Sequence, residues 1–236
     1  MKKEKPTGKK EPSPEEKAFL EIQTQFPEIR RSLLLWYKKN SRNYPWRKTG
    51  NWFHLLMAEM MLRRTKADQV LPVYKKFTEK YRTPKSAAEL TQAEIRRLFE
   101  PLGLSWRGRQ IHKTIAYLSD HYAKRDPCPQ DLLKEIPGVG SYTEAILRNR
   151  LFNERCAAVD SNIVRFFTRI AGTDYDPEKR RKKFLIDSAN RLMNTKRSFE
   201  LNLAILDFTA LVCKSSRPLC SNCCLKKLCM SKYLIE

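Results

Sequence analysis

Residues 136–147 read IPGVGSYTEAIL, and this stretch decides the fold. Pro137 precedes two glycines, Gly138 and Gly140, which flank a valine, and the apolar pattern on both sides is helical. A Rossmann fingerprint needs a third glycine and a preceding strand, and a Walker loop needs Gly-Lys followed by Ser or Thr. Neither requirement is met, so the stretch predicts a helix, a tight turn and a second helix.

The predicted turn suits the backbone of a nucleic acid. Glycines permit a sharp bend and leave backbone N–H groups uncovered. The helix that follows begins with unpaired N–H donors and the positive end of its dipole. Such a place can hold one phosphate without reading the base sequence. A plain connection between two antiparallel helices is the competing interpretation.

The composition favours a polyanionic partner. The chain has 236 residues, 41% of them hydrophobic, and a formal net charge of +21. Nucleic acid is the simplest partner for such an excess, and a membrane surface is the alternative. There is no lipidation motif, no secretory segment and no apolar run of about 18 residues. We therefore expect an intracellular protein, cytoplasmic or nucleoid-associated, that acts as a monomer without membrane association.

Most of the chain shows helical periodicity. The first 13 residues are Lys, Pro and Glu with almost no apolar content, which predicts a disordered basic tail. No segment shows sustained two-residue alternation, so we expect an all-α protein. The predicted helical ranges are 14–36 with an interruption at Pro27, 52–62, 70–81, 87–98, 109–122, 132–136, 142–152, 161–170, 178–194 and 199–212.

Asp160 precedes the helix predicted at 161–170 and has the position of an N-cap. Capping alone would explain an aspartate there. The same geometry also has a chemical use, because a helix dipole favours the ionised form of a carboxyl group at its N-terminus. An ionised, fixed carboxylate can stabilise a sugar oxocarbenium ion.

Five of the seven cysteines lie within the last 24 residues. Four of them, Cys213, Cys220, Cys223 and Cys229, have the spacing Cys-x6-Cys-x2-Cys-x5-Cys. An intracellular basic protein does not normally use such a group for disulfides, so metal binding is the first interpretation. Four thiolates hold either zinc or a [4Fe–4S] cluster, and ligand chemistry alone does not decide between them.

The glycine turn, AVDSNIVRFFTRI and the cysteine spacing, in this order, resemble the helix-hairpin-helix DNA glycosylases of the endonuclease III and adenine-glycosylase group. The resemblance runs from about Tyr44 to Cys229. It implies two all-α lobes with the active site in the cleft between them. Residues 50–152 would form a six-helix lobe, and residues 14–49 with 153–236 the lobe that carries a [4Fe–4S] cluster. Gly138, Val139 and Gly140 would present amides to a phosphate, with a monovalent cation at the hairpin.

The resemblance also assigns catalytic roles. It implies that Asp160 is the catalytic aspartate. Where lyase members carry a lysine that attacks the sugar, this chain has Tyr142, and a phenol cannot form a Schiff base. We therefore expect a monofunctional enzyme that removes the base and leaves an abasic site. Glu59, on an otherwise apolar stretch, would contact the extruded base or donate a proton to it; exposure or pairing with an arginine is the plainer interpretation.

Several basic residues are predicted to contact DNA. Arg63 and Arg64 occupy positions where adenine-excising relatives carry glutamines, and one of them, with Arg63 preferred, would fill the void left by the flipped base. Arg107 and Arg109 lie in a loop that resembles one touching DNA beside the lesion. Lys214 and Arg217 lie in the loop between the first two cysteines and are placed to reach phosphates. A solvated basic surface is the alternative for Arg63, Arg64, Arg107 and Arg109.

The predicted substrate is double-stranded DNA containing a mismatch. Tyr142 and the Arg63–Arg64–Thr65 triplet resemble the branch that removes thymine, and also uracil, opposite guanine. An adenine glycosylase acting opposite 8-oxoguanine is the alternative, although such enzymes carry a further C-terminal domain and only seven residues follow Cys229. A non-catalytic DNA-structure-binding protein is an alternative of another class, and the presence of Asp160 in its motif argues against it.

Overall fold

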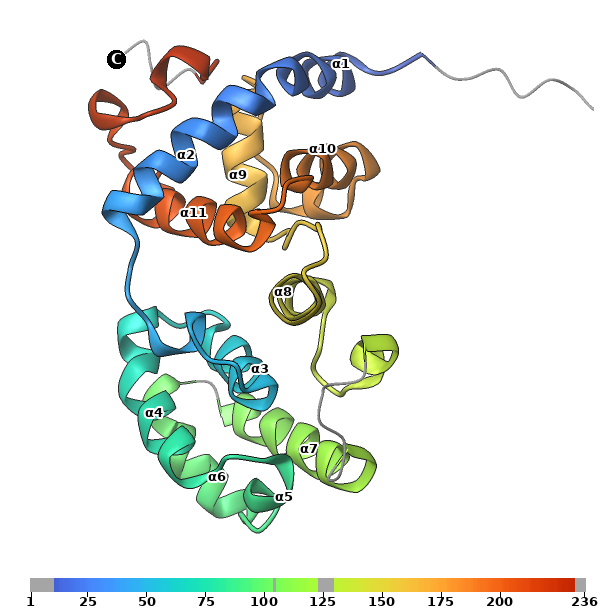
Figure 1. Cartoon of the computed structure of the whole chain (residues 1–236), viewed down its shortest axis with the longest axis vertical. Helices are drawn as coiled ribbons and strands as arrows, with labels where there is room; N and C mark the ends of the chain where they lie inside the picture. The colour runs from blue at the N-terminus through green and yellow to red at the C-terminus, as the bar shows by residue number, and fades with distance from the viewer. Residues whose placement is uncertain (1–10, 104, 123–129, 232–236) are drawn as a thin grey trace, which may run out of the picture. The chain divides into compact units, whose positions relative to one another are not determined.

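The computed structural model describes residues 11–103, 105–122 and 130–231 (Figure 1). All regular structure in these ranges is helical, which confirms the predicted all-α class. The α-helices are α1 (Pro14–Glu21), α2 (Phe26–Asn40), α3 (Trp52–Leu62), α4 (Ala67–Lys80), α5 (Pro84–Ala87), α6 (Gln92–Phe99), α7 (Ser105–Tyr122), α8 (Ser141–Phe152), α9 (Ser161–Ile170), α10 (Lys183–Met193) and α11 (Ser198–Leu211).

The chain forms two compact units, each assembled from separated segments. Unit 1 comprises the described residues within Met1–Lys39, Val159–Leu192 and Leu203–Glu236, and unit 2 comprises those within Asn40–Ala158 and Met193–Asn202. The sequence analysis placed the boundaries at 49/50 and 152/153. It also did not assign the segment 193–202 to the second unit.

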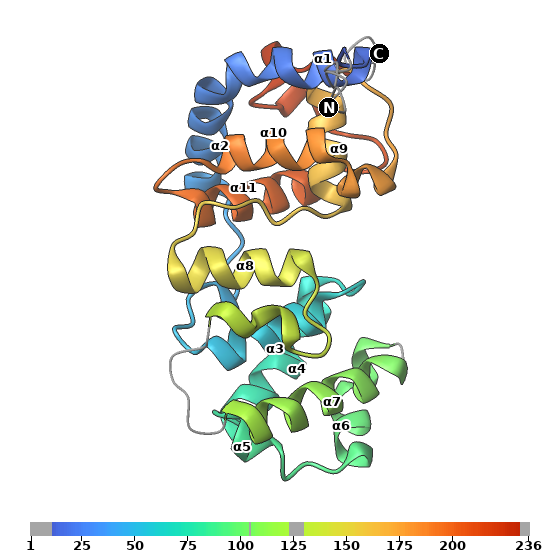
Figure 2. The ribbon, with the colours of Figure 1, turned by 90° about the vertical axis from the view of Figure 1, so that its right-hand side faces the viewer.

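Aromatic side chains build the core of unit 1. Phe167 of α9 stacks on Phe19 of α1, with ring centroids 6.1 Å apart, and meets Phe26 of α2 edge-on. Phe208 of α11 packs edge-to-face against Trp36 of α2, with centroids 5.3 Å apart. Every residue of α9 from Ile163 to Ile170 is buried. This helix therefore supplies much of the core of unit 1, where it lies beside α11 (Figure 2). Asp160 caps its first turn.

Unit 2 is built around α3, which is buried along nearly its whole length. Helices α4 and α8 pack against it, and α5 and α6 pack against α7. The segment 193–202 joins this unit through two buried asparagines. Asn149 donates to Ser198 Oγ at 2.7 Å, and Asn202 accepts from the Ala158 amide at 3.0 Å and donates to the Cys156 carbonyl.

The structure divides two of the predicted ranges, shortens a third and changes the type of a fourth. Range 14–36 is divided by the 3₁₀ turn Ile22–Gln25, so the predicted interruption at Pro27 is wrong, and Pro27 lies in the first turn of α2. Range 87–98 is shortened because Thr91 forms a capping box with Glu94 and starts α6 at Gln92, while Ala87 is the last residue of α5. Range 178–194 divides into a 3₁₀ turn, Pro177–Arg181, and α10. The predicted short helix at 132–136 is a 3₁₀ helix, Gln130–Glu135. None of the helices in the described ranges has both the length and the apolarity that crossing a membrane requires.

Candidate functional site

The glycine stretch forms a hairpin between a 3₁₀ helix and α8. The Val139 amide donates to the Ile136 carbonyl at 2.9 Å, and Gly138 has φ +88°, so Pro137 and Gly138 occupy the centre of a type II turn. A Cβ on Gly138 would lie 2.9 Å from Nε2 of Gln110 and 3.1 Å from Cε of Met60. The positive φ favours glycine here, and a larger residue would also displace the side-chain ends of Gln110 and Met60.

Three successive carbonyl groups of the hairpin accept hydrogen bonds from protein donors. Ile136 accepts from the Val139 amide, Pro137 from Thr114 Oγ1 at 2.6 Å, and Gly138 from the guanidinium of Arg63. The amide of Val139 is thus used inside the turn and does not join the predicted set of phosphate donors. The pairing of these carbonyls also gives no support to the cation predicted at the hairpin.

The amide side of the hairpin is open. Gly140 is the N-cap of α8, no side chain caps this helix, and nothing lies within 4 Å of a Cβ built on Gly140. The first amides of a helix lack intrahelical partners. The first turn of α8 therefore presents donors and a positive dipole end in a place that an anion can reach.

Asp160 caps α9, as the sequence predicts. Its Oδ1 accepts from the backbone amides of Asn162 and Ile163, both at 2.9 Å, and its Oδ2 accepts from Asn162 Nδ2 at 2.7 Å. Burial nevertheless raises the pKa of the carboxyl group, although these hydrogen bonds and the nearby Arg165 act in the opposite direction. The helix terminus alone does not decide the charge state of this group.

A chain of hydrogen bonds links Asp160 to the cysteine loop, and its members were missed by the sequence analysis. Oδ1 of Asn162 accepts from Arg165 Nη2 at 3.0 Å, and Arg165 in turn donates to the carbonyls of Thr209 and Cys213, both at 3.1 Å. One turn further along α9, Arg169 donates to Sγ of Cys213 at 3.3 Å. The available signal was the four-residue spacing of two arginines on an otherwise apolar helix.

The four cysteines with metal-ligand spacing lie in one neighbourhood. Cys213, Cys223 and Cys229 interact electrostatically with one another, Cys220 interacts with Cys229, and burial raises the pKa of Cys223 to about 12. Cys224, the fifth cysteine of this segment, is exposed. In the described part of the chain, no group of three or more His, Cys, Asp or Glu side chains is arranged to hold a metal ion.

The two arginines after α3 differ in their surroundings. Arg63 is partly buried and donates to the Gly138 carbonyl and to Thr143 Oγ1, the latter at 3.3 Å. Glu59 is buried on the preceding turn and attracts Arg63 electrostatically. Arg64 is exposed and has φ +53°. The guanidinium of Arg63 therefore serves the hairpin, and the predicted preference for Arg63 as the residue that enters DNA has no support in this structure.

Tyr142 is the second residue of α8 and packs, partly buried, against the core of unit 2. It stands one residue after the open first position of the helix. Its ring therefore has a packing role, and its backbone position is set by the same turn that leaves Gly140 open.

The other predicted DNA contacts divide into exposed and buried side chains. Arg109, Lys214 and Arg217 are exposed. Arg107 is only 1% exposed, and its guanidinium bonds to backbone carbonyls and to Thr65. The predicted phosphate contact of Arg107 thus has no support in this conformation, because no part of its guanidinium faces solvent.

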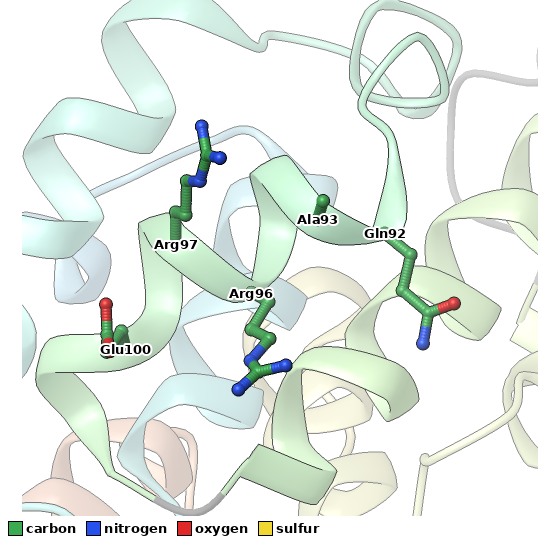
Figure 3. Close-up of a pocket in the computed structure, with 5 residues that line it drawn as sticks. All are labelled: Gln92, Ala93, Arg96, Arg97 and Glu100. Carbon is green, nitrogen blue, oxygen red and sulfur yellow. The ribbon is translucent and has the colours of Figure 1, made fainter.

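A shallow hollow of about 620 Å³ lies on α6 (Figure 3). Arg96 and Arg97 project from the helix in different directions, so they do not converge on one point. The lining residues are Gln92, Ala93, Arg96, Arg97 and Glu100. This arrangement does not form a pocket for a defined anion, and we assign it no role.

The open helix end behind a glycine hairpin, in a strongly basic all-helical chain, defines a nucleic-acid-binding protein of the helix-hairpin-helix class. Comparison with known proteins gives the particular family. Residues 57–188 match the model of the HhH-GPD superfamily base excision DNA repair proteins, and the chain belongs to this family.

Similar proteins cover most of this chain. A thymine/uracil-DNA glycosylase of Methanothermobacter thermautotrophicus is 31% identical over 199 residues, which are 84% of this chain and 90% of that protein. A solved structure of a thermostable thymine-DNA glycosylase has a TM-score of 0.81 and 30% identity, and the match covers 90% of this chain and 97% of that one. An adenine DNA glycosylase of Rattus norvegicus is 30% identical over 85% of this chain but 41% of its own length.

Proposed function

We propose that this protein is a monofunctional DNA glycosylase that removes thymine and uracil opposite guanine. The observation that carries the proposal is the carboxyl group of Asp160, held by two backbone amides and a side-chain amide at the start of a buried helix. The similarity to thymine and uracil glycosylases over most of the chain supports the choice of base.

Asp160 is proposed to act as a fixed negative charge. Departure of the base leaves positive charge on the sugar, and an ionised carboxylate stabilises this charge without having to reorganise. Asn162 bonds to Oδ2, and Arg165 holds Asn162, so rotation of the carboxyl group is restricted. Water then attacks the sugar and leaves an abasic site.

Tyr142 and Glu59 are proposed to act on the extruded nucleotide. A phenol at the position of Tyr142 cannot form a Schiff base, so strand cleavage is not part of the proposed reaction. Glu59 is buried, and a buried carboxyl group requires a partner. Its attraction to Arg63 supplies one, and contact with a flipped base would supply another.

Binding of the duplex is proposed to use the hairpin and the α3–α4 connection. The open first turn of α8 would bind one backbone phosphate. Arg64 is exposed and follows Arg63, the residue that donates to the Gly138 carbonyl of the hairpin. Arg64 is the residue proposed to fill the space left by the flipped base. Arg109, Lys214 and Arg217 would add phosphate contacts. A substrate of this kind implies an intracellular location.

Two sulfur atoms of the cysteine loop receive hydrogen bonds of the kind that suit thiolates. Arg169 donates to Sγ of Cys213, and the Leu225 amide donates to Sγ of Cys223 at 3.4 Å. N–H donors and a nearby guanidinium stabilise thiolate charge. We propose that Cys213, Cys220, Cys223 and Cys229 hold a [4Fe–4S] cluster, which orders the loop and takes no part in base removal.

Metal analysis tests this assignment. Cys220→Ser should lose most of the iron and sulfide and the visible absorbance of the purified protein, whereas Cys224→Ser should keep them. A purified protein that contains zinc instead of iron, or a loss of iron from Cys224→Ser comparable with that from Cys220→Ser, would contradict the proposed ligand set.

Labelled duplexes holding G:T, G:U or 8-oxoguanine:A test the reaction itself. Incubation followed by alkali should nick the G:T and G:U strands only. Nicking at 8-oxoguanine:A alone would instead favour an adenine glycosylase, an activity carried by a relative of 30% identity. Strand cutting without alkali would contradict the assignment of Tyr142, and Asp160→Asn should lower release by about 100-fold or more while keeping DNA affinity.

A further inference from the structure

The connection between α3 and α4 is a turn whose shape is unusual for its sequence. The Thr65 amide donates to the Leu62 carbonyl at 3.2 Å, which closes a four-residue turn. Arg63 has φ −60° and ψ 116°, and Arg64 has φ +53°. These angles define a type II turn, in which the third position normally holds glycine or asparagine because φ is positive there. Here the position holds an exposed arginine.

Arg107 of α7 binds this turn from the protein interior. Its guanidinium donates through Nη1 to the carbonyl of Met61 at 3.2 Å and to Thr65 Oγ1 at 2.6 Å, and through Nη2 to the carbonyl of Arg63. A longer bond of 3.4 Å reaches the Leu102 carbonyl. All four acceptors are uncharged. Burial lowers the pKa of Arg107, and the charge of Arg63 adds to this effect.

The bond to the Arg63 carbonyl selects the type of turn. Type I and type II turns differ by a flip of the peptide between the two central residues, so that its carbonyl points in opposite directions. Arg107 reaches this carbonyl only in the type II orientation. The same orientation requires positive φ at Arg64, which a non-glycine residue avoids unless the surroundings impose it.

We propose that Arg107 is a positioning residue that holds Arg64 in its outward conformation before DNA binds. The inference rests on the proposed role of Arg64 in filling the space of the flipped base. A side chain whose backbone is already set loses less conformational freedom when it enters the duplex. Arg107 therefore acts on base extrusion through the turn and not through a phosphate contact.

A double-mutant cycle distinguishes this role from a merely structural one. The four proteins are the parent, Arg107→Lys, Arg64→Ala and the combination. Lysine keeps the positive charge but cannot bond to three acceptors in one plane. Two readouts are measured: the single-turnover rate on a G:T duplex, and the fluorescence of 2-aminopurine placed beside the mismatch, which reports base extrusion.

Arg107→Lys should lower the rate and the fluorescence change by about tenfold when Arg64 is present, and by less than about twofold in the Arg64→Ala background. Affinity for matched duplex should stay within about twofold of the parent value, because this binding depends on phosphate contacts. Equal losses in both backgrounds would overturn the proposal, since Arg107 would then act independently of Arg64.

Failure of the proposed function gives a different result. If Arg64→Ala alone leaves both readouts at the parent level, then Arg64 is not the residue that fills the duplex, whatever Arg107→Lys does. Arg97→Met, which removes an exposed arginine without an assigned role, is the charge-matched control and should match the parent.

A second variant covers the case in which Arg107→Lys does not fold. Thr65→Val removes the hydroxyl that Arg107 binds at 2.6 Å and keeps the volume of the side chain. It should show the same dependence on Arg64 with a smaller loss. A Thr65→Val loss that persists undiminished in the Arg64→Ala background would contradict the proposal.

Discussion

The carboxyl group of Asp160 is subject to two opposing influences. Burial favours its neutral form, and hydrogen bonds from the amides of Asn162 and Ile163 favour its ionised form. Burial is the larger of the two, so its pKa lies above the ordinary range for aspartate. Asp160 therefore keeps its proton up to a higher pH than an exposed aspartate does. Because the proposed chemistry needs the ionised carboxylate, the enzyme should lose activity below that pH.

The first prediction is therefore a pH profile. Single-turnover base release should fall as pH is lowered through the raised pKa of Asp160, at a pH above that at which ordinary aspartates titrate. The rate of base release is measured on G:U duplexes across the acid range, and alkali is added after each incubation to cut the strand at abasic sites. DNA binding is measured in parallel. A rate that stays constant down into the ordinary aspartate range would contradict a raised pKa for the catalytic group.

The second prediction concerns the residue one step past the glycine turn. Tyr142→Lys places an amine at the second position of α8, where the backbone is set by the hairpin. The variant should gain strand cleavage without alkali and form a covalent adduct with DNA on borohydride treatment, because an amine forms a Schiff base and a phenol does not. Tyr142→Phe is the control and should gain neither. Absence of an adduct from Tyr142→Lys, with binding retained, would contradict the assigned position.

At the scale of the element, the two glycines of the hairpin differ in what they tolerate. Gly138 has φ +88° and side chains within 3.1 Å of a built Cβ, whereas Gly140 is extended and has open space. Gly138→Ala should lower the free energy of unfolding by about 1–2 kcal/mol or more, because alanine is strained at positive φ. In a protein of this size each kcal/mol corresponds to about 2–4 °C in Tm.

Gly140→Ala is the matched variant of this third prediction. Its Tm should stay close to that of the parent, while its affinity for duplex DNA should fall, since the added methyl group projects into the space proposed for a phosphate. Thermal melts and salt-controlled binding measurements check both variants. Unchanged affinity in Gly140→Ala would argue that this end of α8 does not bind DNA.

The helices could be predicted from the sequence to the extent that their ends carried local signals. Asp160 and the apolar spacing behind it placed α9 correctly. The capping box of Thr91 and Glu94 was an available signal, and overlooking it placed the start of the predicted helix at Ala87 instead of Gln92. The 3₁₀ geometry of Gln130–Glu135 carries no such signal in the sequence, because short apolar helices of either type share the same spacing.

The predicted site residues were identified by type more reliably than by orientation. A basic stretch predicts contact with a polyanion. In the structure, however, the guanidinium of Arg107 is buried and that of Arg63 donates to a hairpin carbonyl. Orientation depends on tertiary packing, which periodicity does not report. Asn162 was missed for the same reason: N-cap chemistry predicts that Asp160 accepts from the backbone amides of the first turn, but not that the Asn162 side chain donates to Oδ2.

At the scale of the whole molecule, the charge of +21 sets the binding behaviour. The fourth prediction is a steep dependence of DNA affinity on salt, because each neutralised phosphate releases counterions. With about four phosphate contacts, the Kd for duplex DNA should rise by about 100-fold between about 50 and 200 mM monovalent salt. Titrations at several salt concentrations give the slope. A slope near zero would contradict binding through phosphates.

The segmented construction of the two units has a consequence for the order of events during translation. Nearly all of unit 2 is one continuous run, Asn40–Ala158, whereas unit 1 takes its third segment from Leu203 onward. Domains generally fold as their chains emerge from the ribosome. The hairpin unit can therefore be completed once Met193–Asn202 has emerged, whereas Arg165 binds the carbonyls of Thr209 and Cys213 only after the following segment has emerged. A nascent chain stalled before Thr209 and Cys213 would have a folded hairpin unit, but its Asp160 would lack the hydrogen-bonded support of Arg165.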